Sequence, residues 1–442
     1  MVQEGSGGSS HELVVTAATE QQSQTAFDTV TTRAAVAAQD HFSKVPTEIK
    51  DRIFACLDAD DDLHSLCLTS RACRESAAPL LNSFCDTTAY ANRSGRVDYK
   101  PYLTKLASYP RLGKYVRHAA LGPSIRRRFS CTEVFLSLSY FSNIKSLFLK
   151  RVNGPAFVDT LTFKERFTCL STLICKANPS RVWYLSNIGA LLTVPTLRNL
   201  ILEGCHEPQR AWATRRSPLS GTPLGLRLVQ LRSTDISVRS LGELIEACGQ
   251  LEVFVLHNFN AAYLEHLEGR LPKSIGRRKD SLRFLRLTTS DACPVESWES
   301  LKEFSRLQFL EMSYQFLYGI LERLDTWYIA HILPPSLEGL SISQIEESDI
   351  EDSDLDELLA RLGEARDQYC PRLVDIYLSV RKPYMIDRID RWNEVRKLHE
   401  PKFNIHTFCI GSRRPFHEWV AARYGGFREL DEAYWRYFDE GY

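Results

Sequence analysis

The stretch LRNLILEGC (197–205) recurs in altered form along most of the chain. Its leucines have the spacing LxxLxL, which is also seen in LEVFVL (251–256), LRFLRL (282–287) and LEGLSI (337–342). Eleven such segments follow one another at intervals of 25 to 36 residues. They begin at Val116, Ile144, Leu170, Leu197, Leu226, Leu251, Leu282, Leu307, Leu337, Leu373 and Ile405. A period of this length is typical of solenoids, in which each unit packs only on its neighbours.

These segments resemble leucine-rich repeats. The resemblance implies an α/β fold, a solenoid with parallel strands on its concave face and helices on its convex face. Between predicted strands, residues 237–250 (SVRSLGELIEACGQ) and 296–307 (ESWESLKEFSRL) carry apolar side chains at helical spacing, which predicts a helical convex side. A doubly wound α/β enzyme is the alternative, but that fold rarely keeps LxxLxL in such steady register.

The concave face is the predicted partner-binding surface. The leucines of LxxLxL point into the core, so the residues between them alternate outward. In the middle repeats many of these are apolar, and an exposed apolar row usually marks a protein interface. The predicted substrate-binding residues are Ile201, Val253, Val255, His257, Phe284, Arg286, Phe309 and Glu311. The alternative is that the returning chain or the aromatic C-terminus covers this row.

A second motif, VPTEIKDRIFACLDADDDLHSLCLTSRACRESA (45–77), precedes the repeats. Apolar residues at i, i+4 and i+8 after Pro46 predict one amphipathic helix, Asp60–Asp62 offer an N-cap to a second, and a third follows over about 71–81. The string resembles the F-box, with Val45 in place of the usual leucine and Cys73 in place of an aromatic residue. The resemblance implies that a small all-α module binds a Skp-family adaptor. The implied contacts are Pro46, Ile49, Ile53, Leu57, Leu63 and Leu66. The alternative is a helical hairpin that only caps the next domain.

The chain is therefore predicted to have five parts. Residues 1–40 are poor in aromatic residues and predict a disordered tail. The C-terminal stretch concentrates eight aromatic residues, which favours capping helices over an aromatic ligand-binding motif. The acidic run 346–357 is predicted to be a solvated loop, with an electrostatic docking patch as the alternative. The predicted boundaries are tail 1–40, F-box-like module 42–85, linker helix 86–115, leucine-rich-repeat array 116–412 and aromatic capping helices 413–442. The linker and first repeat resemble those of fungal F-box proteins.

Composition excludes several functional classes. The 55 basic and 55 acidic residues give a net charge of zero, which lacks the basic footprint of nucleic-acid-binding proteins. No apolar run approaches the length of a membrane span, and no signal peptide is evident, so we expect a cytoplasmic or nuclear protein. The 12 cysteines are scattered. Cys67, Cys73 and Cys85 with His64 match no zinc template, so small buried hydrophobic residues are the preferred interpretation over metal ligands.

No motif of a nucleotide-binding, hydrolytic, zinc-dependent or kinase site is present, so we expect no catalytic residue, no metal and no cofactor. The combined motifs favour a non-catalytic substrate receptor of a Skp-cullin-F-box ubiquitin ligase. The F-box would bind the Skp adaptor and cullin complex, and the repeats would hold an unknown protein target, acting through proximity. A ligase-independent repeat scaffold is the alternative, and an enzyme ranks third. Neither nucleic acid nor membrane is an expected partner.

Overall fold

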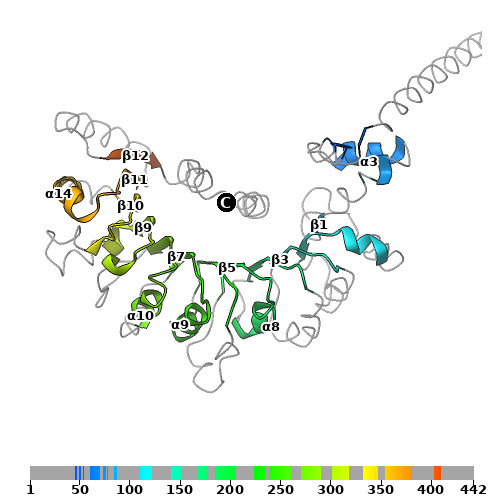
Figure 1. Cartoon of the computed structure of the whole chain (residues 1–442), viewed down its shortest axis with the longest axis horizontal. Coiled ribbons are helices and arrows are strands. Elements are labelled where there is room, and N and C mark those ends of the chain that lie inside the picture. Colours follow the sequence, from blue (N-terminus) through cyan, green and yellow to red (C-terminus); the bar gives the residue numbers. More distant parts are fainter. Residues whose placement is uncertain are drawn as a thin grey trace, which may run out of the picture. The chain divides into compact units, whose positions relative to one another are not determined.

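Figure 1 shows a computed structural model of the chain. Contacts divide it into two compact units, Met1–Cys85 with Arg111–Val116, and Asp86–Pro110 with Arg117–Tyr442. The structure describes residues 45–46, 49–50, 53, 60–69, 73–75, 77, 84–86, 110–121, 141–150, 167–177, 185–205, 223–234, 236, 238–259, 270–289, 301–317, 332–346, 354–380 and 403–409. The predicted tail and the C-terminal capping helices lie outside these residues.

The first unit contains the predicted second helix, α3 (Asp60–Thr69). The helix includes Asp60–Asp62 rather than starting after them, because acidic side chains are favourable in a first helical turn. Residues 49, 50, 53, 73–75 and 77 are also helical. The backbone N–H groups of Ile49 and Lys50 both donate to the Pro46 carbonyl, at 3.1 Å, which places the start of that helix at the proline. Apart from Asp86 and Pro110, the strand β1 (Phe84–Asp86) and the 3-10 helix η1 (Pro110–Tyr115) also belong to this unit.

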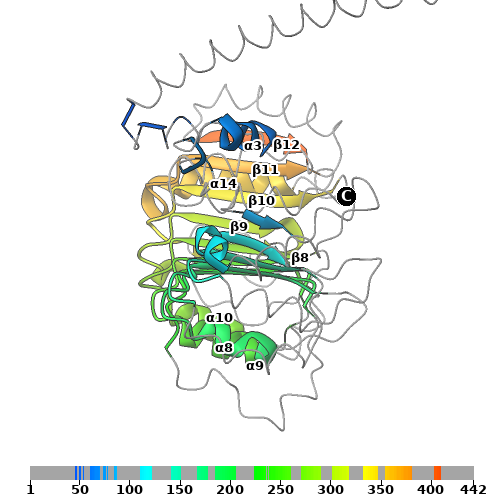
Figure 2. The same ribbon diagram turned by 90° about the vertical axis from the view of Figure 1, so that its right-hand side faces the viewer.

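The second unit contains eleven parallel strands that are hydrogen-bonded in chain order. The strands are β2 (His118–Leu121), β3 (Ser146–Lys150), β4 (Thr172–Lys176), β5 (Asn199–Glu203), β6 (Leu228–Arg232), β7 (Val253–Phe259), β8 (Phe284–Thr289), β9 (Phe309–Ser313), β10 (Gly339–Ile345), β11 (Asp375–Val380) and β12 (Asn404–Cys409). Figure 2 shows β8 to β12 stacked side by side in that order.

The leucines of the repeated motif form the core, as predicted. Leu197, Leu200 and Leu202 are fully buried, and Leu200 and Leu202 pair in register with their equivalents in the neighbouring repeats. Each strand from β2 to β11 begins two residues after the first apolar residue of its motif. Packing of equivalent side chains from neighbouring repeats therefore builds one continuous core.

The phase predicted for the eleventh repeat is wrong. Ile405 pairs with Ile376, so it occupies the second leucine position of its repeat and not the first. The motif therefore begins three residues earlier, at Lys402. Lys402 and Thr407 stand where apolar residues are usual, which hides the correct phase in the sequence.

Helices lie on one face of the sheet, as predicted for the convex side (Figure 1). They are α8 (Gly189–Leu192), preceded by the 3-10 helix η4 (Leu185–Ile188), α9 (Val238–Ala247), α10 (Arg270–Gly276) and α14 (Asp354–Tyr369). Helix α9 confirms the helix predicted within 237–250. The segment 296–307 provides only a short 3-10 helix, η7 (Leu301–Glu303), among its described residues.

The acidic run was predicted to be a loop, but α14 begins inside it, at Asp354. Asp354 and Asp356 therefore lie in the first helical turn, where carboxylates interact favourably with the helix dipole.

Side-chain hydroxyl groups join successive repeats just before the motif. Thr196 donates to the Leu170 carbonyl at 2.8 Å, and Ser281 donates to the Leu251 carbonyl at 2.9 Å. Ser336 donates to the Leu307 carbonyl at 2.8 Å. These bonds satisfy carbonyl groups at the turns that lead into the strands. Parallel strands in chain order, a buried LxxLxL core and helices on one face define a leucine-rich-repeat solenoid.

Within the described residues, no helix has both the length and the apolar character that a membrane crossing requires.

Candidate functional site

The face of the sheet opposite the buried leucines is called the open face here. It carries three rows of side chains, because alternate residues of each strand point to this side. The first row from β3 to β12 is Ser146, Thr172, Asn199, Leu228, Val253, Phe284, Phe309, Gly339, Asp375 and Asn404. The middle row from β3 to β12 is Phe148, Ile174, Ile201, Gln230, Val255, Arg286, Glu311, Ser341, Tyr377 and His406. The third row from β4 to β11 is Lys176, Glu203, Arg232, His257, Thr288, Ser313, Ser343 and Ser379.

The predicted apolar row lies on the open face, but it is not exposed. Its members are nearly fully buried: Ile201 is 1% exposed, Val253 7%, Val255 6%, Phe284 6% and Phe309 0%. The expectation of an exposed apolar patch is therefore wrong. The aromatic C-terminus, which the alternative interpretation places over this row, lies outside the described residues. Neighbouring strands lie about 4.8 Å apart, so side chains of one row also cover one another laterally.

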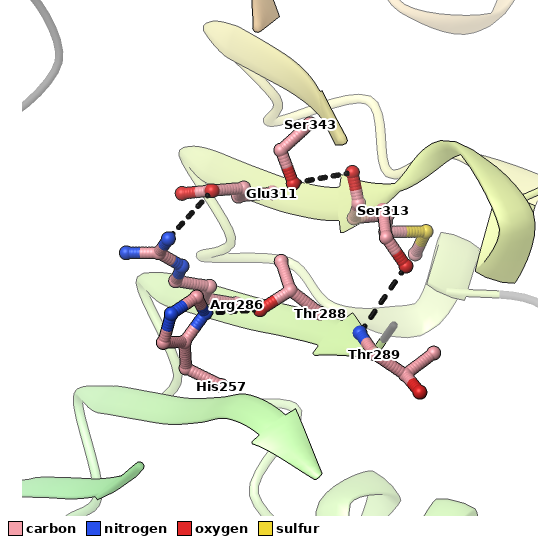
Figure 3. A network of polar contacts seen from close by, with 8 residues as sticks. His257, Arg286, Thr288, Thr289, Glu311, Ser313 and Ser343 are labelled. Atoms are coloured by element: carbon pink, nitrogen blue, oxygen red, sulfur yellow. Dashed lines mark hydrogen bonds and ion pairs between the residues drawn. The ribbon is translucent and has the colours of Figure 1, made fainter. Parts of the chain in front are cut away.

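A buried ion pair lies in the middle row (Figure 3). Arg286 Nη2 is 3.1 Å from Glu311 Oε1, and the two side chains are only 16% and 5% exposed. Burial raises the pKa of Glu311, and the positive charges of Arg286 and Arg232 and a hydrogen bond with Ser343 partly oppose that rise. The second carboxylate oxygen of Glu311 and the Nε of Arg286 are buried without a hydrogen-bond partner. The pair is thus only singly bonded, although arginine and carboxylate can form two parallel bonds.

Hydroxyl groups and one imidazole surround this pair (Figure 3). The Nδ1 of His257 and the Oγ1 of Thr288 are hydrogen-bonded at 2.5 Å across β7 and β8. The Oγ of Ser343 donates to the Met312 carbonyl at 3.4 Å, and Ser313 Oγ accepts from the Thr289 N–H at 3.3 Å. These side chains bond mainly to neighbouring strands, so they fix the relative positions of β7 to β10.

Aromatic rings follow the first and middle rows from β8 to β11. Phe284 and Phe309 are stacked with ring centroids 5.3 Å apart. Phe309 and Tyr377 come within 6.2 Å of each other, although β10 lies between their strands. The β10 neighbour of Phe309 in the first row is Gly339, which has no side chain to fill the space beside the Phe309 ring.

A polar cluster ends the open face at β12, and the sequence analysis did not find it. Asp375 Oδ1 is 3.1 Å from His406 Nε2, and it accepts a hydrogen bond from Asn404 Nδ2 at 3.0 Å. The His406 ring stacks on Tyr377 with centroids 4.7 Å apart, and its side chain is 44% exposed. When the motif of the eleventh repeat begins at Lys402, Asn404 and His406 fall at outward positions. The sequence would therefore have predicted both residues on this face if the phase had been assigned correctly.

The predicted substrate-binding residues therefore differ in accessibility. Six of the eight are nearly buried, including Glu311 at 4% exposure. His257 and Arg286 are partly exposed. Of the eight predicted residues, a partner that approaches the open face could directly contact only His257 and Arg286. Their role in binding remains a prediction.

The predicted adaptor contacts include exposed apolar side chains. Ile49 is 45% exposed and Ile53 is 44% exposed, one helical turn apart. Pro46 is exposed and Leu66 is half-buried. Of the other predicted contacts, Leu57 lies outside the described residues, and Leu63 lies in α3 but its side chain is not described.

Two cysteines of this motif, Cys67 and Cys73, are buried, and the side chains of Cys85 and His64 are not among those described. Cys67 is 8% exposed and Cys73 is 7% exposed, and burial raises the pKa of the Cys67 thiol. Arg74 Nε donates to the Cys67 carbonyl at 3.0 Å, which links α3 to the helical residues 73–75. No cluster of three histidine, cysteine, aspartate or glutamate side chains with the arrangement of a metal site occurs in the part of the chain that the structure describes.

No protein-family model matches this chain, and no curated protein matches it. Among solved structures, the chain is similar to the leucine-rich repeat-containing protein LegL7 from Legionella pneumophila, with 15% identical residues and a TM-score of 0.38. The likeness covers 79% of this chain and 98% of that one. The fold assignment therefore rests on the strand order and repeat register of this chain itself.

Proposed function

We propose that this protein is a non-catalytic substrate receptor of a Skp-cullin-F-box ubiquitin ligase. The repeat array would bind a protein target, and residues 42–85 would bind a Skp-family adaptor. The observation that carries the second part is the pair of exposed isoleucines, Ile49 and Ile53, in a segment that resembles the F-box. Large apolar side chains that share one exposed helix face are commonly covered by a partner.

The array supports the first part of the proposal through its geometry. A leucine-rich-repeat sheet displays many side chains in rows, and each row can be changed one repeat at a time without altering the core. Such surfaces suit the recognition of proteins rather than of small molecules. The mechanism is then proximity, since the receptor holds its target near the ubiquitin-loading enzyme.

A binding experiment with the full-length chain and a purified Skp-family adaptor tests the adaptor part. We expect the wild-type chain to retain the adaptor in a pull-down, and the Ile49→Asp, Ile53→Asp double variant to lose it. Both side chains are exposed, so the change places two charges on the surface and leaves the core intact. Leu68→Asp is the matched control, because Leu68 is 68% exposed and is not among the predicted contacts.

Absence of adaptor binding by the wild-type chain would contradict the ligase role and favour a ligase-independent repeat scaffold. Equal retention by the double variant would show that the adaptor binds elsewhere, and would contradict the contacts proposed here. Circular dichroism of each variant establishes that the fold is unchanged.

A further inference from the structure

The residues that come directly before each strand lie along one edge of the sheet, which we call the leading edge. Backbone hydrogen bonds connect these residues into one ladder. The Lys145 N–H donates to the Arg117 carbonyl at 2.6 Å, and the Arg227 N–H donates to the Arg198 carbonyl at 2.7 Å. From β2 to β11 the leading edge is Arg117, Lys145, Ser171, Arg198, Arg227, Glu252, Arg283, Gln308, Glu338 and Val374. Residues adjacent in this series are therefore neighbours in space.

The leading edge has an uneven distribution of charge. Over β2 to β6 it carries four cations and a serine, and these four, Arg117, Lys145, Arg198 and Arg227, are called the basic strip. Over β7 to β10 the leading edge carries two acidic residues, one amide and one arginine: Glu252, Arg283, Gln308 and Glu338. There the side chains contact one another: Arg283 Nη2 donates to Gln308 Oε1 at 3.0 Å, and Gln308 Nε2 donates to Glu338 Oε1 at 2.9 Å.

The cations of the basic strip are available to a partner. Arg117 and Lys145 are exposed and form no ion pair with any described acidic residue. The Arg227 side chain is 54% exposed, and its only ionic contact among the described residues is Glu252, at 3.5 Å. Exposed pairs of this kind contribute little stability, so they can be exchanged for a partner.

Arg198 differs from the other three because the protein holds it in place. Its Nη1 donates to the carbonyls of Pro195 at 2.7 Å, Leu197 at 3.0 Å and Gly225 at 3.3 Å. The guanidinium charge is thus fixed beside backbone acceptors, without an acidic side chain to neutralise it. A pre-positioned cation loses less conformational entropy when it binds an anion.

From these observations, we propose that the basic strip binds an acidic, extended peptide segment of a partner protein. The peptide would cross the strand ends, with its carboxylates opposite Arg117, Lys145, Arg198 and Arg227. Five adjacent strands at about 4.8 Å each give a span of about 19 Å, which an extended chain of about six residues covers. The strip lies in a chain of zero net charge, so its positive potential is local and suits a short acidic segment better than a long nucleic acid.

The proposal deepens the target-binding role proposed for the array and does not require the adaptor. The two experiments can therefore fail separately. The probe here is a fluorescein-labelled octaglutamate peptide, and the measurement is fluorescence anisotropy with the full-length chain at about 50 mM salt.

We expect saturable binding that weakens when the salt is raised to about 150 mM, because exposed charges are screened. The Arg117→Glu, Lys145→Glu double variant should bind at least about tenfold more weakly, since two attractive contacts become repulsive. The control is Arg306→Glu, which makes the same kind of charge change at an exposed arginine outside the strip and should leave the affinity within about twofold.

Three results would overturn the proposal. They are no octaglutamate binding at low salt, equal binding by the double variant, and an equal loss in the Arg306→Glu control. A fluorescein-labelled single-stranded octadeoxynucleotide is the second arm. Tighter binding of this oligonucleotide than of octaglutamate, lost in the same double variant, would assign the strip to nucleic acid and contradict the peptide proposal.

Discussion

The middle row of the open face has two halves of different chemistry. From β3 to β7 it holds Phe148, Ile174, Ile201, Gln230 and Val255, and from β8 to β12 it holds Arg286, Glu311, Ser341, Tyr377 and His406. We call these the apolar half and the polar half. Ile201 and Glu311 are both nearly fully buried, at 1% and 4% exposure. Burial therefore stabilises the apolar half, because it removes apolar side chains from water. In the polar half, burial is favourable only where the polar groups have hydrogen-bond or ionic partners.

The polar half should be the more sensitive to loss of a single partner. Arg286→Met removes the only ionic partner of Glu311 within 4 Å among the described residues, and leaves the buried carboxylate with only the weaker effects of Arg232 and Ser343. We expect it to lower the free energy of unfolding by about 3 to 5 kcal/mol. Thermal denaturation followed by circular dichroism measures the effect.

The matched variant is Arg286→Met with Glu311→Leu, which removes both charges and keeps similar volumes. It should recover most of the loss, because a well-packed apolar pair can replace a buried ion pair. A single variant as stable as the wild type would show that the pair makes no net contribution.

The apolar half should respond in proportion to the volume removed. Ile201→Ala leaves a cavity at a position that is 1% exposed, and we expect it to lower the free energy of unfolding by about 2 to 4 kcal/mol. Ile201→Val removes one methylene group and should cost about 1 kcal/mol. Chemical denaturation of the two variants provides the comparison, and equal effects would argue against burial as the cause.

A change of pH should also affect the stability of the two halves differently, by a smaller amount. Burial raises the pKa of Glu311 above its ordinary value. Between the unfolded pKa of about 4.3 and the folded pKa, the folded state binds more protons than the unfolded state, so this group's contribution to stability falls as pH rises. That contribution is fully present below the unfolded pKa and is lost as pH rises through the folded pKa.

Glu311→Gln removes this titration and retains an acceptor for Arg286. We therefore expect the wild type to lose stability relative to Glu311→Gln as pH rises above about 4.5, in thermal melts compared at each pH. An opposite trend would mean that Arg286 lowers the pKa more than burial raises it. Ile201 has no titratable group, so Ile201→Ala should show the same pH dependence as the wild type.

The sequence predicted the core well because LxxLxL records directly which side chains meet between repeats. It placed Leu200 and Leu202 in the core, and it placed Ile201 and Glu203 on the opposite face. It failed for β12, since Lys402 and Thr407 break the pattern and Ile405 then suggests a false start. Phase is therefore predictable only where the repeat keeps its apolar residues.

The candidate site was less predictable than the core. Periodicity shows which face a side chain occupies, but it does not show whether that face is covered, so the sequence left the burial of Phe284 and Phe309 as an open alternative. Nor does it show pairing across strands. The Arg286 and Glu311 positions were both predicted to lie on this face, but their ion pair depends on the register of β8 with β9. The uneven distribution of charge along the leading edge also depends on the register between neighbouring strands.

The leading-edge ladder also has a consequence for the order in which the chain folds. Each of its bonds joins residues one repeat apart, from 25 residues for Glu252 and Arg227 to 36 for Val374 and Glu338. Adding a repeat therefore closes a loop of nearly constant length, whether the array is short or long. Folding can start at any two adjacent repeats and extend in both directions, and the terminal strands, which have fewer neighbours, should be the first to exchange their amide hydrogens.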